Sequence, residues 1–368
     1  MRSTITAVNR DHPIRVVRPT DFTCEPTGEI SPEEVLGEPS FSLYCFDPEN
    51  DAALFVESKD LAAVERAPFY YQAQVEHAIG LVSMPLEVFH RVAERIPWPQ
   101  KGLIFVHSVG RCGSTLVSKA LEAVPSVYSL SEPDDLTQMV NLRVAGAVSE
   151  QWLGEALVSS IKWRGARTPE FLAIKPRSEV MVLGDLFGSC FPEARHFFLY
   201  RNAVNWMRSC FRGFPPDRNV YDQELNQKGQ DGWAQTIPLV RQLAKEGAPM
   251  NPVQVRILAW VTCMEGYLRL AEMGVPLAAA RFEDLTADPI PILSQLFDFC
   301  GITSVQWDAI QDVLSKDSQA GTLYAREERR KLTRELTPEL IQDLKTVIAS
   351  RPLLGSPDVV LPGTFRPR

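Results

Sequence analysis

After residue 100, stretches with the pattern of buried strands alternate with stretches that have the pattern of amphipathic helices. Continuous apolar runs, as expected for strands covered on both faces, occur at 103–106, 171–174, 197–200 and 276–282. The segments between them carry apolar residues at helical spacing, as in 116–121. This alternation predicts an α/β fold of three layers, in which helices cover both faces of a central parallel sheet.

Capping residues mark two helices in the last third of the chain. Asp288 before Pro289 is expected to start one helix, and Gly301 to end it. Thr337, which also precedes a proline, is expected to start another. Residues 213–255, in contrast, are polar and rich in Pro, Gly, Asn and Gln, and therefore predict a loop near a substrate rather than core.

The first hundred residues differ from the rest of the chain. A polar, Pro-containing stretch is followed by short apolar runs at 41–46 and 53–56 and then by helix-like segments. We therefore divide the chain into three parts. These are an N-terminal extension or small α+β module over 1–100, a main domain over 101–350 and a C-terminal tail over 351–368.

Composition places the chain among ordinary globular proteins. It has 368 residues, of which 45% are hydrophobic, and its formal net charge is -8 because 46 acidic residues outnumber 38 Lys and Arg. This acidic balance argues against a nucleic-acid or membrane-surface partner, so an anionic ligand would need a local cluster of basic groups. No apolar run is long enough for a membrane span, and no signal peptide is recognised at the start. The seven cysteines contain no C-x-x-C, which favours neither a zinc site nor disulfides and fits a cytoplasmic location.

The most informative stretch joins the apolar run at 103–106 to the next helix through a glycine-containing turn. It reads Gly110-Arg111-Cys112-Gly113-Ser114-Thr115. A strand, a turn and a helix N-terminus in this order direct backbone N–H groups at one point, where the helix dipole also favours an anion. The two glycines permit unusual dihedral angles, the two hydroxyls add donors, and Arg111 adds positive charge. The sequence thus predicts a P-loop-like phosphate site, with a tight turn that binds nothing as the alternative.

A second candidate anion site follows the apolar run at 197–200. Arg201 stands at the C-terminal end of that predicted strand, where open α/β sheets bind ligands, and Asn202 is placed to cap the next helix. Ser209 lies on the same helix. An arginine here suits bidentate recognition of a phosphate, although a surface arginine paired with an acid is the alternative.

Together these segments resemble the sulfotransferases that use 3'-phosphoadenosine-5'-phosphosulfate (PAPS). Arg111, Cys112, Gly113, Ser114 and Thr115 are similar to the family loop that holds the 5'-phosphosulfate. Arg201 and Ser209 are similar to the pair that holds the 3'-phosphate, and Phe282 in Arg-Phe-Glu-Asp-Leu to an aromatic contact near the adenine. The resemblance covers about residues 101–350 and implies PAPS as co-substrate. The family's R-K-G loop has no match. The basic run 326–334 is a candidate substitute, but a solvated helix face is the favoured interpretation of this run.

The resemblance also suggests which residues carry out the chemistry. Lys175 matches a family lysine near the bridging oxygen of the donor, but Arg177 stands where cytosolic members have a catalytic histidine, and an arginine cannot act as a base. Other members use a glutamate about twenty residues after the loop, which here is Glu132. The chain therefore resembles the Glu-base type rather than the His-base type. We expect Glu132 to deprotonate the acceptor during an in-line displacement, with fixed cations rather than a metal ion neutralising the leaving group. A loop carboxylate that caps a helix is the alternative for Glu132.

Two other functions remain open from the sequence. A P-loop nucleoside-phosphate kinase is disfavoured because the Walker lysine after Gly113 is replaced by Ser114. A catalytically inactive nucleotide-binding module is the third option. The acceptor is not identified, and a small molecule, a carbohydrate or a lipid with a hydroxyl or amine fits; 136–170 and 213–255 are the expected lining of its pocket. A homodimer through the N-terminal module also stays open.

Overall fold

The computed structural model describes residues 1–168, 170–212, 231–247, 250–320, 325 and 336–366. The chain forms two compact units, each built from two separate stretches. The first comprises Met1–Leu103 and Pro125–Arg177, and the second comprises Ile104–Val124 and Ser178–Arg368. The division at residues 100 and 350 that the sequence suggested stays a prediction.

A five-stranded sheet with the strand order β10-β9-β6-β8-β7 forms the centre of the fold. Its strands are β6 (Gly102–Ser108), β7 (Val127–Ser131), β8 (Phe171–Lys175), β9 (Arg195–Tyr200) and β10 (Leu277–Arg281). The pairs β10/β9, β9/β6 and β7/β8 are parallel. The predicted α/β fold with a parallel central sheet is therefore confirmed, and each of the four apolar runs named above forms one of these strands.

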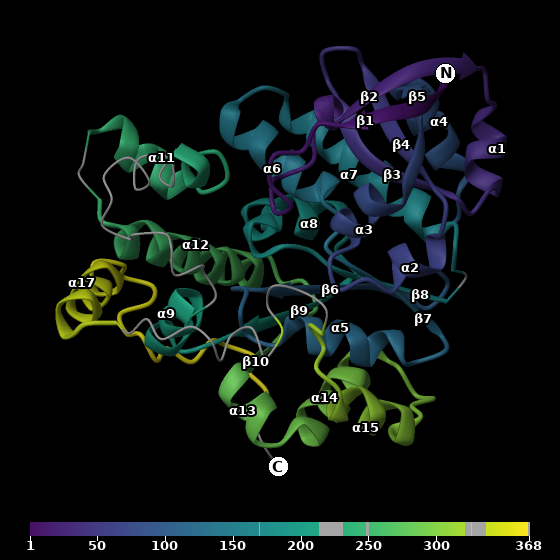
Figure 1. Ribbon diagram of the computed structural model, residues 1–368. Helices are drawn as coiled ribbons and strands as arrows, with labels where there is room; N and C mark the ends of the chain where they lie inside the picture. The colour runs from purple at the N-terminus through teal and green to yellow at the C-terminus, as the bar shows by residue number, and fades with distance from the viewer. Residues whose placement is uncertain (169, 213–230, 248–249, 321–324, 326–335, 367–368) are drawn as a thin grey trace. The chain divides into compact units, whose positions relative to one another are not determined.

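Helices of the second unit cover both faces of its part of this sheet. They are α5 (Ser114–Glu122), α8 (Gly184–Cys190), α9 (Ala203–Arg212), α11 (Pro238–Lys245), α12 (Pro252–Glu272), α13 (Phe282–Ala287), α14 (Pro289–Cys300), α15 (Trp307–Ser315) and α17 (Pro338–Ala349), with a 3₁₀ helix at Ser178–Leu183. Figure 1 shows α8 and α12 on one side of β9 and β6, and α5 and α14 on the other. This arrangement gives the unit three layers.

The first unit contains a second, antiparallel sheet with the strand order β2-β1-β5-β4-β3. Its strands are β1 (Arg2–Val8), β2 (Phe22–Gly28), β3 (Phe41–Asp47), β4 (Ala52–Ser58) and β5 (Ala78–Pro85). The helices of this unit are α1 (Pro32–Gly37), α2 (Leu61–Glu65), α3 (Tyr70–His77), α4 (Leu86–Arg95), α6 (Asp135–Ala145) and α7 (Glu150–Gly165), with a 3₁₀ turn at Pro19–Asp21. The apolar runs at 41–46 and 53–56 became β3 and β4. The mostly exposed β1 and β2 have no such run.

The predicted helix ends are confirmed, with one difference. The Asn202 side chain accepts hydrogen bonds from Val204 N and Asn205 N at 3.0 and 3.2 Å, as expected of the residue that caps α9. α14 begins after Asp288 and ends at Gly301, which has a positive φ of 72°. The Asp288 side chain, however, makes no capping hydrogen bond, so the fixed φ of Pro289 is what favours the start of this helix.

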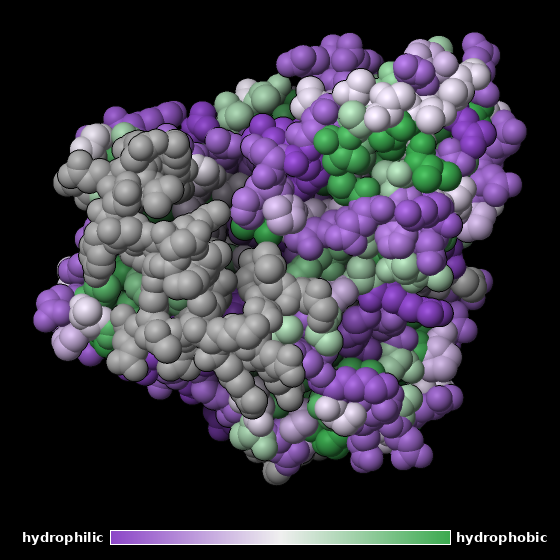
Figure 2. Space-filling model, in the orientation of Figure 1, coloured by the Kyte–Doolittle hydropathy of each residue, from purple (hydrophilic) through white to green (hydrophobic). Residues whose placement is uncertain are grey.

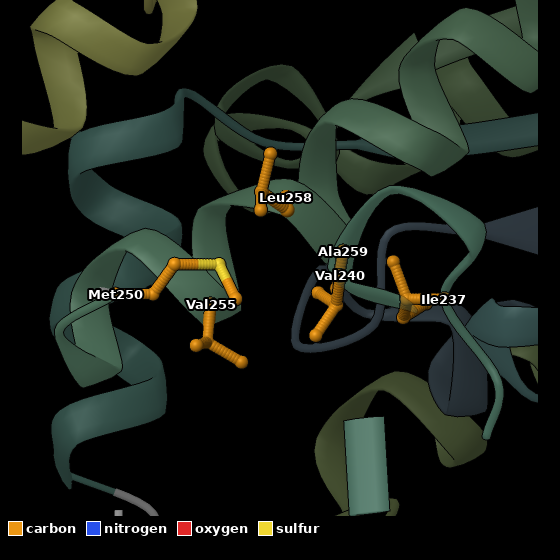
Figure 3. Close-up of a cluster of buried hydrophobic side chains, with 6 residues drawn as sticks. All are labelled: Ile237, Val240, Met250, Val255, Leu258 and Ala259. Atoms are coloured by element: carbon orange, nitrogen blue, oxygen red, sulfur yellow. The ribbon is translucent and has the colours of Figure 1, made fainter. Parts of the chain in front are cut away.

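Part of the stretch 213–255 belongs to the core, so the prediction of a loop is wrong there. Residues 213–230 and 248–249 lie outside the described residues. The remainder contains α11 and the start of α12, which pack together through a buried apolar cluster shown in Figure 3. The cluster consists of Ile237, Val240, Met250, Val255, Leu258 and Ala259. The polar composition concealed it because α11 buries only one face.

The coloured residues on one face of the molecule are mostly polar. Hydrophilic residues make up most of the coloured surface on the face drawn in Figure 2. None of the described helices combines the length and the apolar character needed to cross a membrane.

Two buried histidines stack within the core of the second unit. His107 on β6 and His196 on β9 have parallel rings, and His107 Nε2 lies 3.1 Å from His196 Nδ1. Phe105 and Phe187 pack around them. Burial lowers the pKa of His196 to about 4, and burial together with the neighbouring ring lowers the pKa of His107 well below its usual value. Both histidines are therefore neutral in the folded protein.

Stability is expected to fall as the pH drops below about 6.5, because the unfolded chain then binds protons that the folded core excludes. The loss per histidine is about 1.4 kcal/mol for each pH unit, down to the pKa of about 4 for His196. Urea unfolding between pH 7 and pH 5 measures it. The double variant H107F/H196F should show a flatter dependence than the wild type, whereas H12Q, which changes a partly exposed histidine, should not. An equally steep dependence in the double variant would contradict this assignment.

Candidate functional site

The turn between β6 and α5 has a backbone that only a few residue types adopt easily. Gly110, Arg111 and Gly113 have positive φ angles of 70°, 54° and 86°. Glycine takes this left-handed conformation without strain, but arginine does not, so Arg111 is held there by its surroundings. Gly113 is also the N-cap of α5. Successive turn residues of this kind direct backbone N–H groups into one concavity, which is suited to an anion.

Contacts from β9 and α9 hold this turn in place. Trp206 donates its indole N–H to the carbonyl oxygens of Val109 and Gly110, at 2.9 and 3.0 Å. The Val109 N–H and the Cys112 thiol both donate to the carbonyl oxygen of Leu199, at 3.1 and 3.3 Å. The turn is thus fixed before any ligand binds.

Arg201 reaches from the end of β9 to this turn. Its guanidinium donates to the carbonyl oxygen of Arg111 at 3.4 Å and lies 4.2 Å from the centre of the Phe282 ring. Burial lowers the pKa of Arg201; attraction to Glu283 opposes this effect, and repulsion from Arg111 adds to it. Within the described part of the chain, the buried Nε of Arg201 has no hydrogen-bond partner. An anion would supply one.

Phe282 closes the other side of the turn. It begins α13, directly after β10, and its ring lies against Gly113. A side-chain carbon added at Gly113 would stand 3.2 Å from Leu285 and 3.5 Å from Phe282. The positive φ and this close approach together favour glycine at this position. We call Arg111, Gly113, Arg201 and Phe282 the turn cluster.

The C-terminal segment ties together the two strand ends that carry Arg201 and Phe282. Asp358 forms an ion pair with Arg281 and accepts a hydrogen bond from Asn202 Nδ2 at 3.1 Å. Further along, the backbone of Ala279 in β10 pairs with residues 363–365. Asn202 and Arg281 directly flank Arg201 and Phe282, so Asp358 restrains both neighbours.

The first unit holds the two residues predicted to carry out the chemistry, and it brings them together. Glu132 follows β7 with a positive φ of 64°, and its N–H donates to the carbonyl oxygen of Lys175 at 2.6 Å. Their side chains form an ion pair in which 12% of Glu132 and 5% of Lys175 are exposed. A carboxylate and an ammonium thus stand side by side at the ends of two paired strands.

Each of the two carboxylates after Glu132 also has a cation as partner. Asp134 is buried, pairs with Arg177 at 3.2 Å and accepts from Val17 N at 3.0 Å. Burial raises its pKa to about 6, although Arg177 opposes this. Asp135 pairs with Arg164. Arg177, which occupies the position of the family histidine, is thus bound to Asp134 and packs 5.3 Å from the Tyr71 ring.

The remaining predicted residues are those of the turn, Ser209 on α9 and the basic run 326–334. The side chains of Cys112, Ser114 and Thr115 are buried, and Ser114 Oγ accepts a hydrogen bond from Ser108 at 3.3 Å. Ser209 is half-buried on α9, and among the described residues no hydrogen bond or ion pair joins it to the turn cluster. Its part in a site stays a prediction. The basic run 326–334 lies outside the described residues.

Sequence reasoning missed Trp206, Glu283 and Asp358. Trp206 and Asp358 act through residues far away in the chain, so no local pattern points to them.

Within the described residues, no group of three or more His, Cys, Asp or Glu side chains is arranged to hold a metal ion.

Comparisons with known proteins return sulfotransferases among solved structures. A sulfotransferase from Alicyclobacillus acidocaldarius is 14% identical over 71% of this chain and 96% of its own, with a TM-score of 0.41. A sulfotransferase from Mycobacterium avium is 14% identical over 86% and 87%, with a TM-score of 0.41. A mouse sulfotransferase in complex with PAP is 12% identical over 74% and 92%, with a TM-score of 0.35.

No protein-family model and no curated protein matches the chain. The likeness to these solved structures is distant in both identity and TM-score.

Replacing Gly113 by alanine should destabilise the second unit more than the same change at a glycine in open space. Gly274 offers the matched control, since it has a similar φ of 72° but no atom near an added side chain. Left-handed backbone costs alanine about 1 to 2 kcal/mol at either position, and the contact with Leu285 adds to this only in G113A. Chemical unfolding measures both variants. Equal losses would show that the space around Gly113 is not restricted.

Proposed function

We propose that the chain is a PAPS-dependent sulfotransferase that moves a sulfuryl group to a hydroxyl or amine of an acceptor. One observation carries this proposal most strongly. Arg201 contacts the turn at Arg111, which lies 90 positions earlier in the chain, and its guanidinium also stacks on the ring of Phe282. Three residues chosen from the sequence for donor binding therefore share one cluster.

The turn cluster fits the donor in charge and in shape. Arg111 and Arg201 supply positive charge to an otherwise acidic chain. The N-terminus of α5 and the turn amides suit a terminal phosphate, and the unpartnered Nε of Arg201 suits a second one. The Phe282 ring, already flanked by a guanidinium, offers an apolar surface for a base. A nucleotide with two separated phosphate groups matches this set of groups.

Glu132 and Lys175 fit the chemical step. The bound donor supplies an activated sulfuryl group. In the proposed step Glu132 accepts the proton of the acceptor, which raises the nucleophilicity of the acceptor oxygen or nitrogen. Lys175 changes partner from Glu132 to the leaving phosphate oxygen and stabilises the charge that develops there. The ion pair between them orients both side chains until substrates bind.

Replacing Glu132 by glutamine should abolish turnover while donor binding persists. A general base contributes about 10² to 10⁴ in rate, so the turnover of E132Q should fall by at least about 10². The assay offers PAPS with a panel of phenols, sugars, lipids and amines, and detects sulfated product by mass. The matched control is E170Q, which removes a carboxylate paired with Lys101 at the surface of the same unit. If E132Q kept its turnover, or lost donor binding as well, Glu132 would not be the base.

Arg201 should matter for binding rather than for the chemical step. We expect R201A to bind adenosine 3',5'-bisphosphate about tenfold more weakly or worse, because a buried charge-assisted contact is lost. R208A, which removes an exposed arginine from the same helix, should bind normally. Calorimetry measures the affinities, and thermal shift compares the bisphosphate with ATP and magnesium. Stabilisation by ATP and magnesium alone would favour a kinase instead.

A further inference from the structure

Glu283 is a buried carboxylate without a hydrogen-bond donor. It lies in the first turn of α13, next to Phe282. Both of its carboxylate oxygens are buried, although 31% of the side chain is exposed, so the carboxylate turns inward. Among the described residues none donates a hydrogen bond to either oxygen. A buried acceptor in this state is costly unless another molecule satisfies it.

The surroundings of Glu283 are cationic. Arg281 Nε lies 3.9 Å from Glu283 Oε2, which is an ion-pair distance but too long for a hydrogen bond. The guanidinium of Arg281 is instead engaged by Asp358 through its terminal nitrogen. Arg201 is also attracted electrostatically to the Glu283 carboxylate. The Glu283 carboxylate is therefore attracted to these arginines, but neither of its oxygens accepts a hydrogen bond from a described residue.

The turn cluster and the adjacent Glu283 thus hold unsatisfied polar atoms of two opposite kinds. The Nε of Arg201 lacks an acceptor, and the two oxygens of Glu283 lack a donor. An inorganic phosphate could satisfy only the guanidinium, and at contact distance it would be repelled by the carboxylate. A ligand that satisfies both must carry an anionic group beside a neutral O–H or N–H group. A nucleoside phosphate has this combination.

We propose that Glu283 is a specificity-determining residue that accepts a hydrogen bond from an O–H or N–H group of the nucleoside part of the donor. The inference rests on the proposed function, because it assumes that the turn cluster binds a nucleotide. Two groups of adenosine 3',5'-bisphosphate have the required chemistry, namely the ribose 2'-hydroxyl and the exocyclic amine of the base. Glu283 would distinguish this nucleotide from analogues that lack the group.

A cycle of ligand and protein changes tests the assignment. Calorimetry compares adenosine 3',5'-bisphosphate with its 2'-deoxy analogue and with the inosine analogue, which has an oxygen in place of the amine. The proteins are the wild type, E283A, E283Q and D284N. D284N removes one charge from the same turn of the same helix and serves as the matched control.

The wild type should bind one of the two analogues roughly tenfold more weakly, as expected for a lost hydrogen bond to a charged group. E283A should bind the parent ligand more weakly and no longer distinguish it from that analogue, whereas D284N should discriminate like the wild type. E283Q, which keeps one acceptor oxygen, should retain part of the preference. Whichever analogue is rejected identifies the group that Glu283 contacts.

Two results would overturn the assignment of Glu283. One is equal affinity of the wild type for all three ligands, a measurement that does not depend on any variant folding. The other is an unchanged preference in E283A. Failure of the proposed function looks different, because the wild type would then not bind adenosine 3',5'-bisphosphate at all.

Discussion

The concentration of positive charge around one turn is the constraint on which the candidate site depends. Burying the Arg201 guanidinium next to Arg111 is unfavourable, because water is removed and like charges repel. The fold offsets this with the face of Phe282, with the carbonyl oxygen of Arg111 and with the nearby carboxylate of Glu283 on α13. These contacts hold the arginines in place but leave capacity for an anion.

Preorganisation follows from the same contacts. Trp206 fixes the carbonyl groups at the start of the turn. The backbone N–H groups of the turn therefore need no rearrangement to bind a ligand. Glu132 and Lys175 are preorganised differently, through the register of β7 and β8, which aligns Ser131 with Lys175. The two groups of residues thus use separate means, a pinned turn in one unit and strand pairing in the other.

Local patterns in the sequence predicted those parts of the fold that depend on local physics. Four strands of the central sheet, the cap at Asn202 and the glycine turn follow from runs of apolar residues and from residue preferences within a few positions. β1 and β2 were missed because their exposed, polar residues are held by pairing with distant segments. α11 was missed because it lies in a polar stretch of the sequence and buries only one face.

The same distinction between local and long-range information applies to the candidate site. Arg201, Gly113 and Phe282 could be chosen from the sequence, since each stands where a strand ends or a helix begins. The ion pair between Glu132 and Lys175 requires knowing that β7 and β8 are neighbours, which no local pattern encodes. Glu283 was part of a recognised segment, but only the burial of its oxygens distinguishes it from Asp284.

The C-terminal segment has a consequence beyond the restraint of Arg281. An outer strand presents unpaired N–H and C=O groups, which can recruit a strand from another molecule. At β10 the Ala279 N–H donates to Gly363 and the Ala279 carbonyl accepts from Phe365, at 3.1 and 2.8 Å. The chain thereby shields this margin of its own sheet. Protection against edge-to-edge aggregation and the restraint of Arg281 are consequently supplied by the same C-terminal segment.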